Sequence, residues 1–246
     1  EADVLVENFK PGTLEKWAMS PDELMAINPS LIIARVSGFG QTGPYSDRPG
    51  FASVGEAMGG LRYINGFPDQ PPPRSGISLG DTLTGLFAAQ GILMALYWRD
   101  GLGGGRGQVI DASIMESCFT MMESSLMEYD KLGIIRQPSG TGLAKVAPSN
   151  IYPTKDEKYL VIAANLDPMF NRLCKAMGKP ELSSDPKFDT HMSRGENAEE
   201  LDALIGEWTQ NMTATQLDEH LDSHGVVTGP IYTIADIAED KHFKDR

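Results

Sequence analysis

Residues 4–37 read VLVENFKPGTLEKWAMSPDELMAINPSLIIARVS, and this stretch decides the fold class. The apolar runs Val4–Val6 and Leu31–Val36 have the length and composition of buried strands. Between them, Ser20-Pro21-Asp22-Glu23 has the cap residue, the proline and the acidic first turn typical of a helix start. A strand, a helix and a strand at this spacing predict a βαβ unit. We therefore expect an α/β fold with part of an open, parallel, Rossmann-like sheet.

The longest run of small and apolar residues follows Gly80. From Asp81 to Arg99 the chain carries little charge, which predicts a long buried helix that begins at Asp81. The Asp81 carboxylate then has two compatible interpretations. It can be the N-cap, accepting hydrogen bonds from free backbone N–H groups of the first turn. It can also be a nucleophile, because the helix dipole favours a carboxylate there and the neighbouring glycines leave room for a ligand.

Composition excludes several classes of protein. The net charge of -13 and the pI near 4.7 argue against a nucleic-acid binder, which needs clustered Lys and Arg. Cys118 and Cys174 lie far apart without metal-ligand spacing, which indicates core thiols in a reducing compartment. No uninterrupted apolar run reaches about 18 residues and no signal peptide is visible, so we expect a cytoplasmic protein without a membrane partner.

The chain is long enough for one to two domains. Residues 1–136 form the expected large catalytic domain, in which Ile114–Leu132 reads as a methionine-rich helix. Scattered proline, glycine and serine make residues 137–150 the expected linker. The strand-like Tyr159–Ala164 and several amphipathic helices predict a smaller α+β domain over residues 151–246.

Three polar patterns have competing interpretations. Gly38, Gly40 and Gly43 resemble a dinucleotide fingerprint, but Pro44 follows and no helix opens there, which favours a loop that presents its backbone to a ligand. Lys10 and Lys16 are either solvated surface residues or anchors for a ligand phosphate. His220 and His224 share a helical spacing without a third ligand, which favours a solvated helix face and no metal.

Several ordered motifs together resemble the class III coenzyme A transferases, also called the CaiB/BaiF type. This family includes formyl-CoA transferase, carnitine CoA-transferase and their relative α-methylacyl-CoA racemase. The motifs are Val6–Gly12, Ser37–Pro44, Arg48–Phe51, Leu79–Asp81 with Thr84-Gly85, and Gly105–Asp111. The resemblance extends to Tyr159–Asn165 and Gly229-Pro230. Since the family's amino-terminal part and closing segment have no counterpart here, and the first residue is Glu1, we expect a chain truncated at both ends.

The resemblance implies that Asp81 is the nucleophile. In such enzymes the aspartate attacks an acyl-CoA thioester to give a mixed anhydride, the released CoA thiolate converts this to an aspartyl-CoA thioester, and an acceptor carboxylate takes the CoA. Backbone N–H groups beside the site can stabilise the oxyanions of each step. The implied substrates are an acyl-CoA and a carboxylic acid, with no tightly bound cofactor. The family also implies an interlinked homodimer.

The resemblance assigns further residues to binding. Those expected to bind CoA are Asn8, Phe9, Lys10, Lys16 and Arg48, and those expected to shape the substrate pocket are Gly38, Phe39, Gly40 and Phe51.

Two departures from the family pattern bear on specificity. Phe51 stands where the racemase branch carries its catalytic histidine, and a phenyl ring cannot exchange a proton. Ala52 stands where formyl-CoA transferase carries a glutamate. The motifs Gln41–Pro44 and Arg48–Phe51 look closer to transferases of succinate and other dicarboxylates. The alternatives are an acyl-CoA racemase or epimerase and a CoA-binding remnant without turnover.

Overall fold

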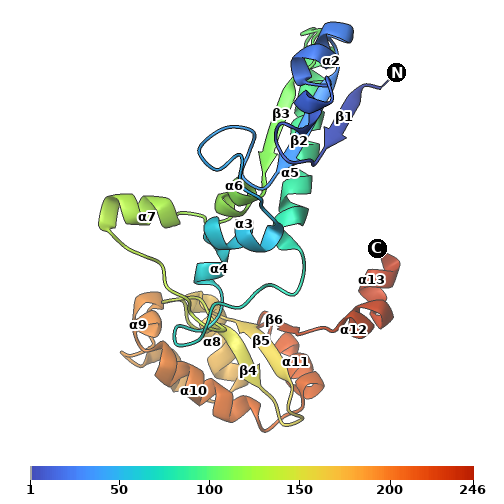
Figure 1. Ribbon diagram of the computed structural model, residues 1–246. Helices are drawn as coiled ribbons and strands as arrows, with labels where there is room; N and C mark the ends of the chain where they lie inside the picture. The colour runs from blue at the N-terminus through green and yellow to red at the C-terminus, as the bar shows by residue number, and fades with distance from the viewer. Residues whose placement is uncertain (1) are drawn as a thin grey trace. The chain divides into compact units, whose positions relative to one another are not determined.

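The computed structural model describes residues 2–246 and divides the chain into two units, Glu1–Pro138 and Ser139–Arg246, which we describe separately. The elements of each unit are labelled in Figure 1.

The first unit is built on a parallel sheet. Strands β1 (Val4–Glu7), β2 (Ile32–Ser37) and β3 (Val109–Ser113) lie in the order β1-β2-β3, with Val6 opposite Ala34 and Arg35 opposite Asp111. The central strand is almost wholly buried, and Ile32, Ile33 and Ala34 are completely inaccessible. Burial on both faces explains its continuous apolar run. The predicted α/β class with a parallel sheet is confirmed.

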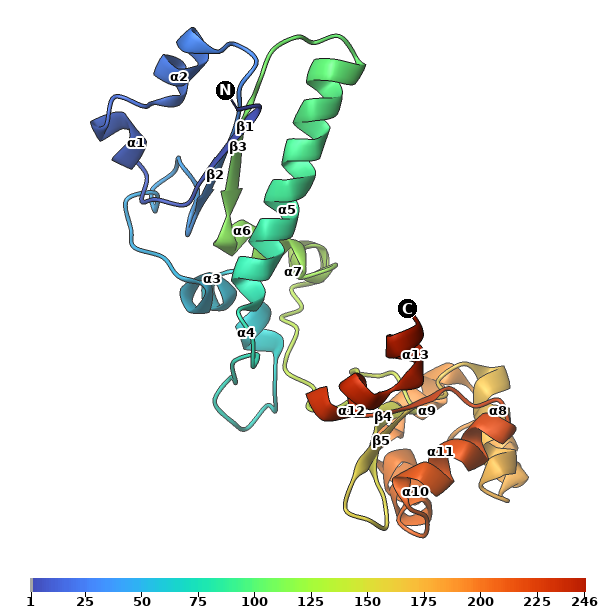
Figure 2. The same ribbon diagram turned by 90° about the vertical axis from the view of Figure 1, so that its right-hand side faces the viewer.

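Helices cover the sheet. The long helix α5 (Leu79–Leu96), followed by a π-helical turn (Tyr97–Gly101), runs along one face, and α1 (Thr13–Lys16) and α2 (Pro21–Ile27) lie on the other side (Figure 2). Helix α2 begins where predicted, with Ser20 as its cap, and it has a capping box, in which the Ser20 side chain accepts from Glu23 N and the Glu23 side chain accepts from Ser20 N.

The expectation that α5 is buried is wrong. Its buried residues are the small ones, Gly80, Thr84, Ala88 and Ala95, whereas Leu86, Leu93 and Met94 are 64%, 66% and 65% exposed. Gly80, Thr84 and Ala88 follow one another at a four-residue spacing, and these small side chains let the helix backbone lie close to the strands, so the larger apolar side chains face outward. Within residues 2–246, Leu79–Gly101 is the one segment long and apolar enough to span a membrane by length and composition, and 22% of it is buried. A helix packed on a sheet can have the same composition, so we assign it no membrane role.

The remaining helices of the first unit lie beyond the carboxyl ends of the strands. They are α3 (Ala52–Met58), α4 (Leu61–Ile64), α6 (Ile114–Thr120) and α7 (Ser125–Leu132). The single helix predicted over residues 114–132 is therefore two, and the break contains Glu123 with φ of 51°. Helix α3 packs tightly on α6, because a Cβ at Gly55 would lie 2.5 Å from Ile114 Cγ2.

The second unit is α+β, as predicted. Strands β4 (Ser149–Pro153), β5 (Tyr159–Ala163) and β6 (Thr228–Pro230) form an antiparallel sheet in the order β4-β5-β6. Its helices are α8 (Asp167–Ala176), the 3-10 helix Pro180–Ser184, α9 (His191–Glu196), α10 (Ala198–Thr209), α11 (Ala214–Ser223), α12 (Ile234–Glu239) and α13 (Lys241–Asp245). Within the expected linker, Ala147 lies in the core of this unit and Ser149 opens β4. Residues 139–150 are thus part of the second unit.

Candidate active site

Two cavities lie where the strands of the first unit end. The larger, about 460 Å³, is lined by residues of β1, β2, α5 and α6: Val6, Glu7, Asn8, Val36, Asp81, Thr84, Gly85 and Ile114. The smaller, about 240 Å³, is lined by Asn8–Pro11, Ser37, Gly38 and Arg48–Phe51. Asn8 lines both, so the two cavities adjoin at the end of β1. Ligands of open α/β sheets bind at this edge.

Asp81 lies in the first turn of α5 and lines the larger cavity. It is not the N-cap, as the alternative interpretation required, because the helix begins two residues earlier and Ser78 holds the cap position. None of the hydrogen bonds or ion pairs found among residues 2–246 uses the Asp81 carboxylate. A Cβ at Gly85, one turn further on, would meet no atom within 4 Å. The carboxylate is therefore uncommitted and has open space beside it.

A residue far from α5 in the sequence accepts a hydrogen bond from the first turn of this helix, in place of an N-cap side chain. The Ser78 side chain makes no capping bond, and Glu56 of α3 instead accepts a hydrogen bond from Gly80 N at 3.2 Å. Glu56 is 3% exposed. A carboxylate at this position satisfies one of the free N–H groups of the helix and complements its dipole. Sequence reasoning missed this residue, since nothing near α5 in the sequence marks it.

The predicted binding residues divide into two groups. Asn8, Phe9, Lys10, Gly38, Arg48 and Phe51 all line the smaller cavity. Phe39, Gly40 and Lys16 line neither cavity. Lys16 ends α1, and Phe39 is buried with its ring 5.8 Å from that of Tyr45. The structure thus brings together the Asn8–Lys10 loop and Arg48, while Phe39 lies beside Gly50, where an added Cβ would be 3.1 Å from its ring.

Two glycines make the smaller cavity possible. A Cβ at Gly38 would lie 2.7 Å from Gly50 Cα, and one at Gly50 would lie 2.9 Å from Gly38 Cα. The loops after β2 and before α3 can therefore cross in close contact only with glycine at both positions. Arg48 emerges beside this crossing and stacks on the Tyr45 ring at 4.0 Å from its centroid.

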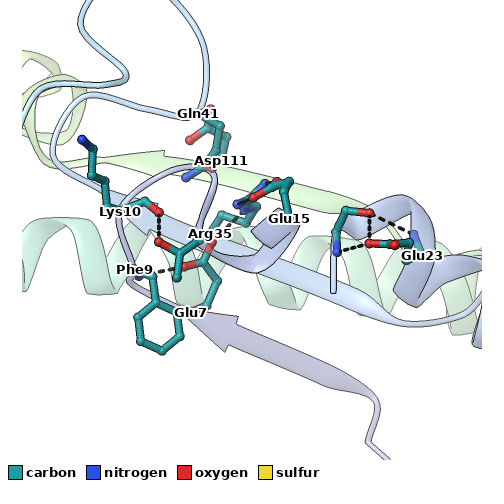
Figure 3. Close-up of polar contacts among 10 residues, drawn as sticks. Glu7, Phe9, Lys10, Glu15, Glu23, Arg35, Gln41 and Asp111 are labelled. Atoms are coloured by element: carbon teal, nitrogen blue, oxygen red, sulfur yellow. Dashed lines mark hydrogen bonds and ion pairs between the residues drawn. The ribbon is translucent and has the colours of Figure 1, made fainter. Parts of the chain in front are cut away.

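A polar network lies under the Asn8–Lys10 loop (Figure 3). Arg35 Nε donates to Glu7 Oε1 at 2.7 Å, and Arg35 Nη1 donates to Glu15 Oε1 at 2.7 Å. The second oxygen of Glu7 accepts from Phe9 N, also at 2.7 Å. The hydrogen bond from Arg35 holds the pKa of the Glu15 carboxyl below its ordinary value. Sequence reasoning missed this network, although a charged residue inside the apolar run of β2 was a signal for it.

Asp111 supports the glycine-rich loop from β3. Its Oδ2 accepts from Gln41 N at 2.8 Å. Burial raises the pKa of this carboxyl above its ordinary value, partly offset by that hydrogen bond. A Cβ at Gly40, which has φ of +90°, would approach Asp111 Oδ2 to 3.5 Å.

A model of CoA-transferase family III matches residues 1–246. The chain belongs to CoA-transferase family III. The resemblance inferred from the ordered motifs is thereby confirmed.

Individual relatives are consistent with this membership. The chain is 55% identical to the succinyl-CoA–D-citramalate CoA-transferase of Chloroflexus aurantiacus over 241 residues, which are 98% of this chain and 60% of that protein. It is 39% identical to the succinyl-CoA–L-malate CoA-transferase alpha subunit of the same organism, over 100% of this chain and 57% of that protein. A CAIB/BAIF family protein from Brucella suis superposes with a TM-score of 0.86 at 36% identity, over 100% of this chain and 64% of that one. The chain thus spans about 60% of the length of the similar family III proteins.

The described residues 2–246 contain no cluster of three or more His, Cys, Asp or Glu side chains arranged to hold a metal ion. His220 and His224 instead stack at 4.6 Å between ring centroids, and His220 Nε2 contacts Ala176 O at 2.9 Å.

Neither cysteine should react readily in the folded protein. Burial raises the pKa of the Cys118 thiol, and the negative charges of Glu56 and Asp81 raise it further, while burial raises the pKa of Cys174 to about 11. Because only the thiolate attacks a disulfide reagent, we expect no fast-reacting thiol with Ellman's reagent at pH 8 and two equivalents after denaturation. A full equivalent released at the rate of a free thiol would contradict the buried placement of that cysteine.

Proposed function

We propose that this protein is a CoA-transferase that moves CoA from an acyl-CoA thioester to an acceptor carboxylate, with Asp81 as the nucleophile. The observation that carries the proposal is an uncommitted carboxylate in a cavity that adjoins, through Asn8, a second cavity lined by Lys10 and Arg48. Membership in family III supports this chemistry for the pair of cavities.

The proposed reaction uses one carboxylate twice. An Asp81 oxygen attacks the thioester carbonyl, the carbon–sulfur bond breaks, and CoA leaves as its thiolate, so that a mixed anhydride remains. The thiolate then attacks the Asp81 carbonyl of the anhydride and releases the donor as a carboxylate. The resulting aspartyl-CoA thioester reacts with the acceptor by the same two steps in reverse, which regenerates Asp81. Splitting the exchange into these steps needs no water and no external proton.

The binding roles follow from charge and position. We propose that Lys10 and Arg48 pair with phosphate groups of CoA, that Asn8 and Phe9 contact its adenosine end, and that Lys16 adds positive charge nearby. Gly38 and Phe51 shape the substrate pocket directly, because they line the smaller cavity. Phe39 and Gly40 shape it indirectly, through the glycine-rich loop that follows β2. The entire chain carries a net charge of -13, so these few cations are the local attraction for an anionic substrate.

Succinyl-CoA and a dicarboxylate are the proposed substrates. Three similar proteins are named as transferases of CoA from succinyl-CoA to D-citramalate, L-malate or mesaconate, and a fourth is named succinate–glutarate CoA-transferase. For the whole protein we further propose a cytoplasmic homodimer with no tightly bound cofactor and no nucleic-acid or membrane partner. The exposed Leu86, Leu93 and Met94 of α5 support the dimer, since large apolar patches mark protein interfaces.

A trapping experiment tests the nucleophile and ranks the donors. The protein is mixed with succinyl-CoA, acetyl-CoA and other acyl-CoAs, treated with hydroxylamine, and analysed by intact and peptide mass spectrometry. We expect a hydroxamate on the Asp81 peptide, strongest with succinyl-CoA. A hydroxamate on another carboxylate would overturn the assignment. Exchange of the α-proton of a branched acyl-CoA, without any adduct, would instead establish a racemase.

The phosphate contacts give a separate prediction. Lys10→Ala and Arg48→Ala should each raise KM for succinyl-CoA about tenfold with little change in kcat, since a charge-assisted hydrogen bond contributes about 1.5–3 kcal/mol. The effect should shrink in high salt. Steady-state kinetics at two ionic strengths measures it. The matched control is Lys131→Ala, which removes an exposed lysine of the same unit that pairs only with its neighbour Asp130 and should leave KM unchanged.

A further inference from the structure

Glu7 lies where the two cavities of the candidate site adjoin. It is the last residue of β1, it is 5% exposed, and it is one of the residues that line the cavity that holds Asp81. The next three residues, Asn8, Phe9 and Lys10, line the other cavity. A displacement of Glu7 would therefore change the lining of both cavities.

Both oxygens of this carboxylate are committed. Oε1 accepts from Arg35 Nε and Oε2 accepts from Phe9 N, each at 2.7 Å. Arg35 is itself buried and also pairs with the more exposed Glu15. The carboxylate thus clamps the backbone of the loop to a fixed guanidinium on the central strand (Figure 3).

The loop has two other attachments, and neither reaches the Asp81 cavity. The Phe9 ring packs edge-on against Trp17 at 5.1 Å between centroids, and the Thr13 hydroxyl donates to Lys10 O at 2.6 Å. Both partners belong to the α1 segment. Among these three attachments, Glu7 alone is a residue that lines the Asp81 cavity.

Stability alone does not explain why the protein buries the Glu7–Arg35 ion pair. A buried ion pair often contributes less than well-packed apolar side chains of the same volume. Its distinctive contribution is geometry, because a bond at each oxygen fixes the carboxylate in both position and direction.

We propose that Glu7 is a positioning residue that sets the Asn8–Lys10 loop relative to Asp81, so that a CoA held by the loop presents its thioester to the nucleophile. This inference rests on the proposed CoA-transferase function. Small displacements of a bound substrate reduce the rate strongly, since reacting atoms must meet within about 3–3.5 Å.

Three variants separate position from charge. Glu7→Asp keeps the carboxylate but withdraws it by one methylene. Glu7→Gln keeps one acceptor and loses the charge. The double variant Glu7→Met with Arg35→Met removes both charges from the interior and leaves Phe9 N without its acceptor. The matched control is Glu15→Gln, which weakens the exposed side of the same network. Glu15 lines neither cavity, and its side chain is 41% exposed.

The expected result is a defect in both steady-state constants. We expect each Glu7 variant, Glu7→Asp included, to raise KM for succinyl-CoA and to lower kcat, each about tenfold. Glu15→Gln should stay within about twofold of wild type in both. The double variant should show the same kinetic defect with a melting temperature near that of the wild type, which separates loss of position from loss of fold.

Two results would overturn the inference. One is wild-type kinetics in Glu7→Asp together with a defect in Glu7→Gln, which would mean that only the charge matters. The other is a defect in Glu15→Gln as large as that of the Glu7 variants. Failure of the proposed function would be seen in a different experiment, the hydroxylamine trapping, as the absence of any Asp81 adduct in the wild type. In that case CoA affinity by calorimetry still reports on the loop, and equal affinities of wild type and Glu7→Asp would refute the role of Glu7.

Discussion

Replacing Asp81 with asparagine should lower kcat by at least about 10³-fold and abolish the hydroxylamine-trapped adduct, because an amide cannot form the mixed anhydride. Affinity for CoA should change by less than about twofold, since the proposed phosphate contacts lie in the adjoining cavity. The fold should be unaffected, because the carboxylate makes no hydrogen bond within residues 2–246. Stopped assays with succinyl-CoA and a panel of dicarboxylates give kcat, and calorimetry with CoA gives the affinity.

Asp22→Asn is the matched control for this experiment. Asp22 is also an exposed acid in the first turn of a helix, α2, but it lines neither cavity. Its replacement should leave kcat and the adduct unchanged. An Asp81→Asn protein that still accumulates an acyl-enzyme, after deamidation back to aspartate has been ruled out by mass, would remove Asp81 from the mechanism.

The parallel sheet was predictable because its signals are local. The strands β1 and β2 are short apolar runs, and the start of α2 is marked by a capping box within four consecutive residues. The start of α5 was misplaced because its stabilising partner is Glu56, 24 residues away from Gly80 in the sequence. Ser78 holds the cap position but makes no capping bond, and local reasoning assigned the cap to Asp81 instead.

The candidate site was predictable in part for the same reason. The ordered motifs pointed to Asn8–Lys10 and Arg48, and the structure places them around one cavity. The Glu7–Arg35 pair joins residues 28 apart in the sequence, and no spacing rule connects them. The exposure of Leu86 and Leu93 was also beyond prediction, because an apolar composition does not tell which side of α5 meets the sheet.

In the second unit, Arg194→Ala should cost about 3–5 kcal/mol of unfolding free energy. The Arg194 side chain is completely buried and donates to Ala147 O at 3.3 Å, Phe188 O at 2.9 Å and Asn165 O at 2.8 Å. It also pairs with Asp167 Oδ1 at 2.6 Å and stacks on the Phe170 ring at 4.6 Å. Removing it leaves Ala147 O and Phe188 O without a donor and a void where the guanidinium lay. Urea unfolding followed by tryptophan fluorescence, with Trp208 as the reporter of this unit, measures the loss.

Two further variants separate the hydrogen bonds from the charge. Arg194→Lys keeps a cation but lacks the planar fork that reaches three carbonyls, so it should recover only a small part of the loss. Arg172→Ala removes an arginine whose one hydrogen bond, to Gly225 O at 3.0 Å, is exposed, and it should cost less than about 1 kcal/mol. An Arg194→Ala protein that unfolds within 1 kcal/mol of the wild type would show that the three carbonyls find other donors.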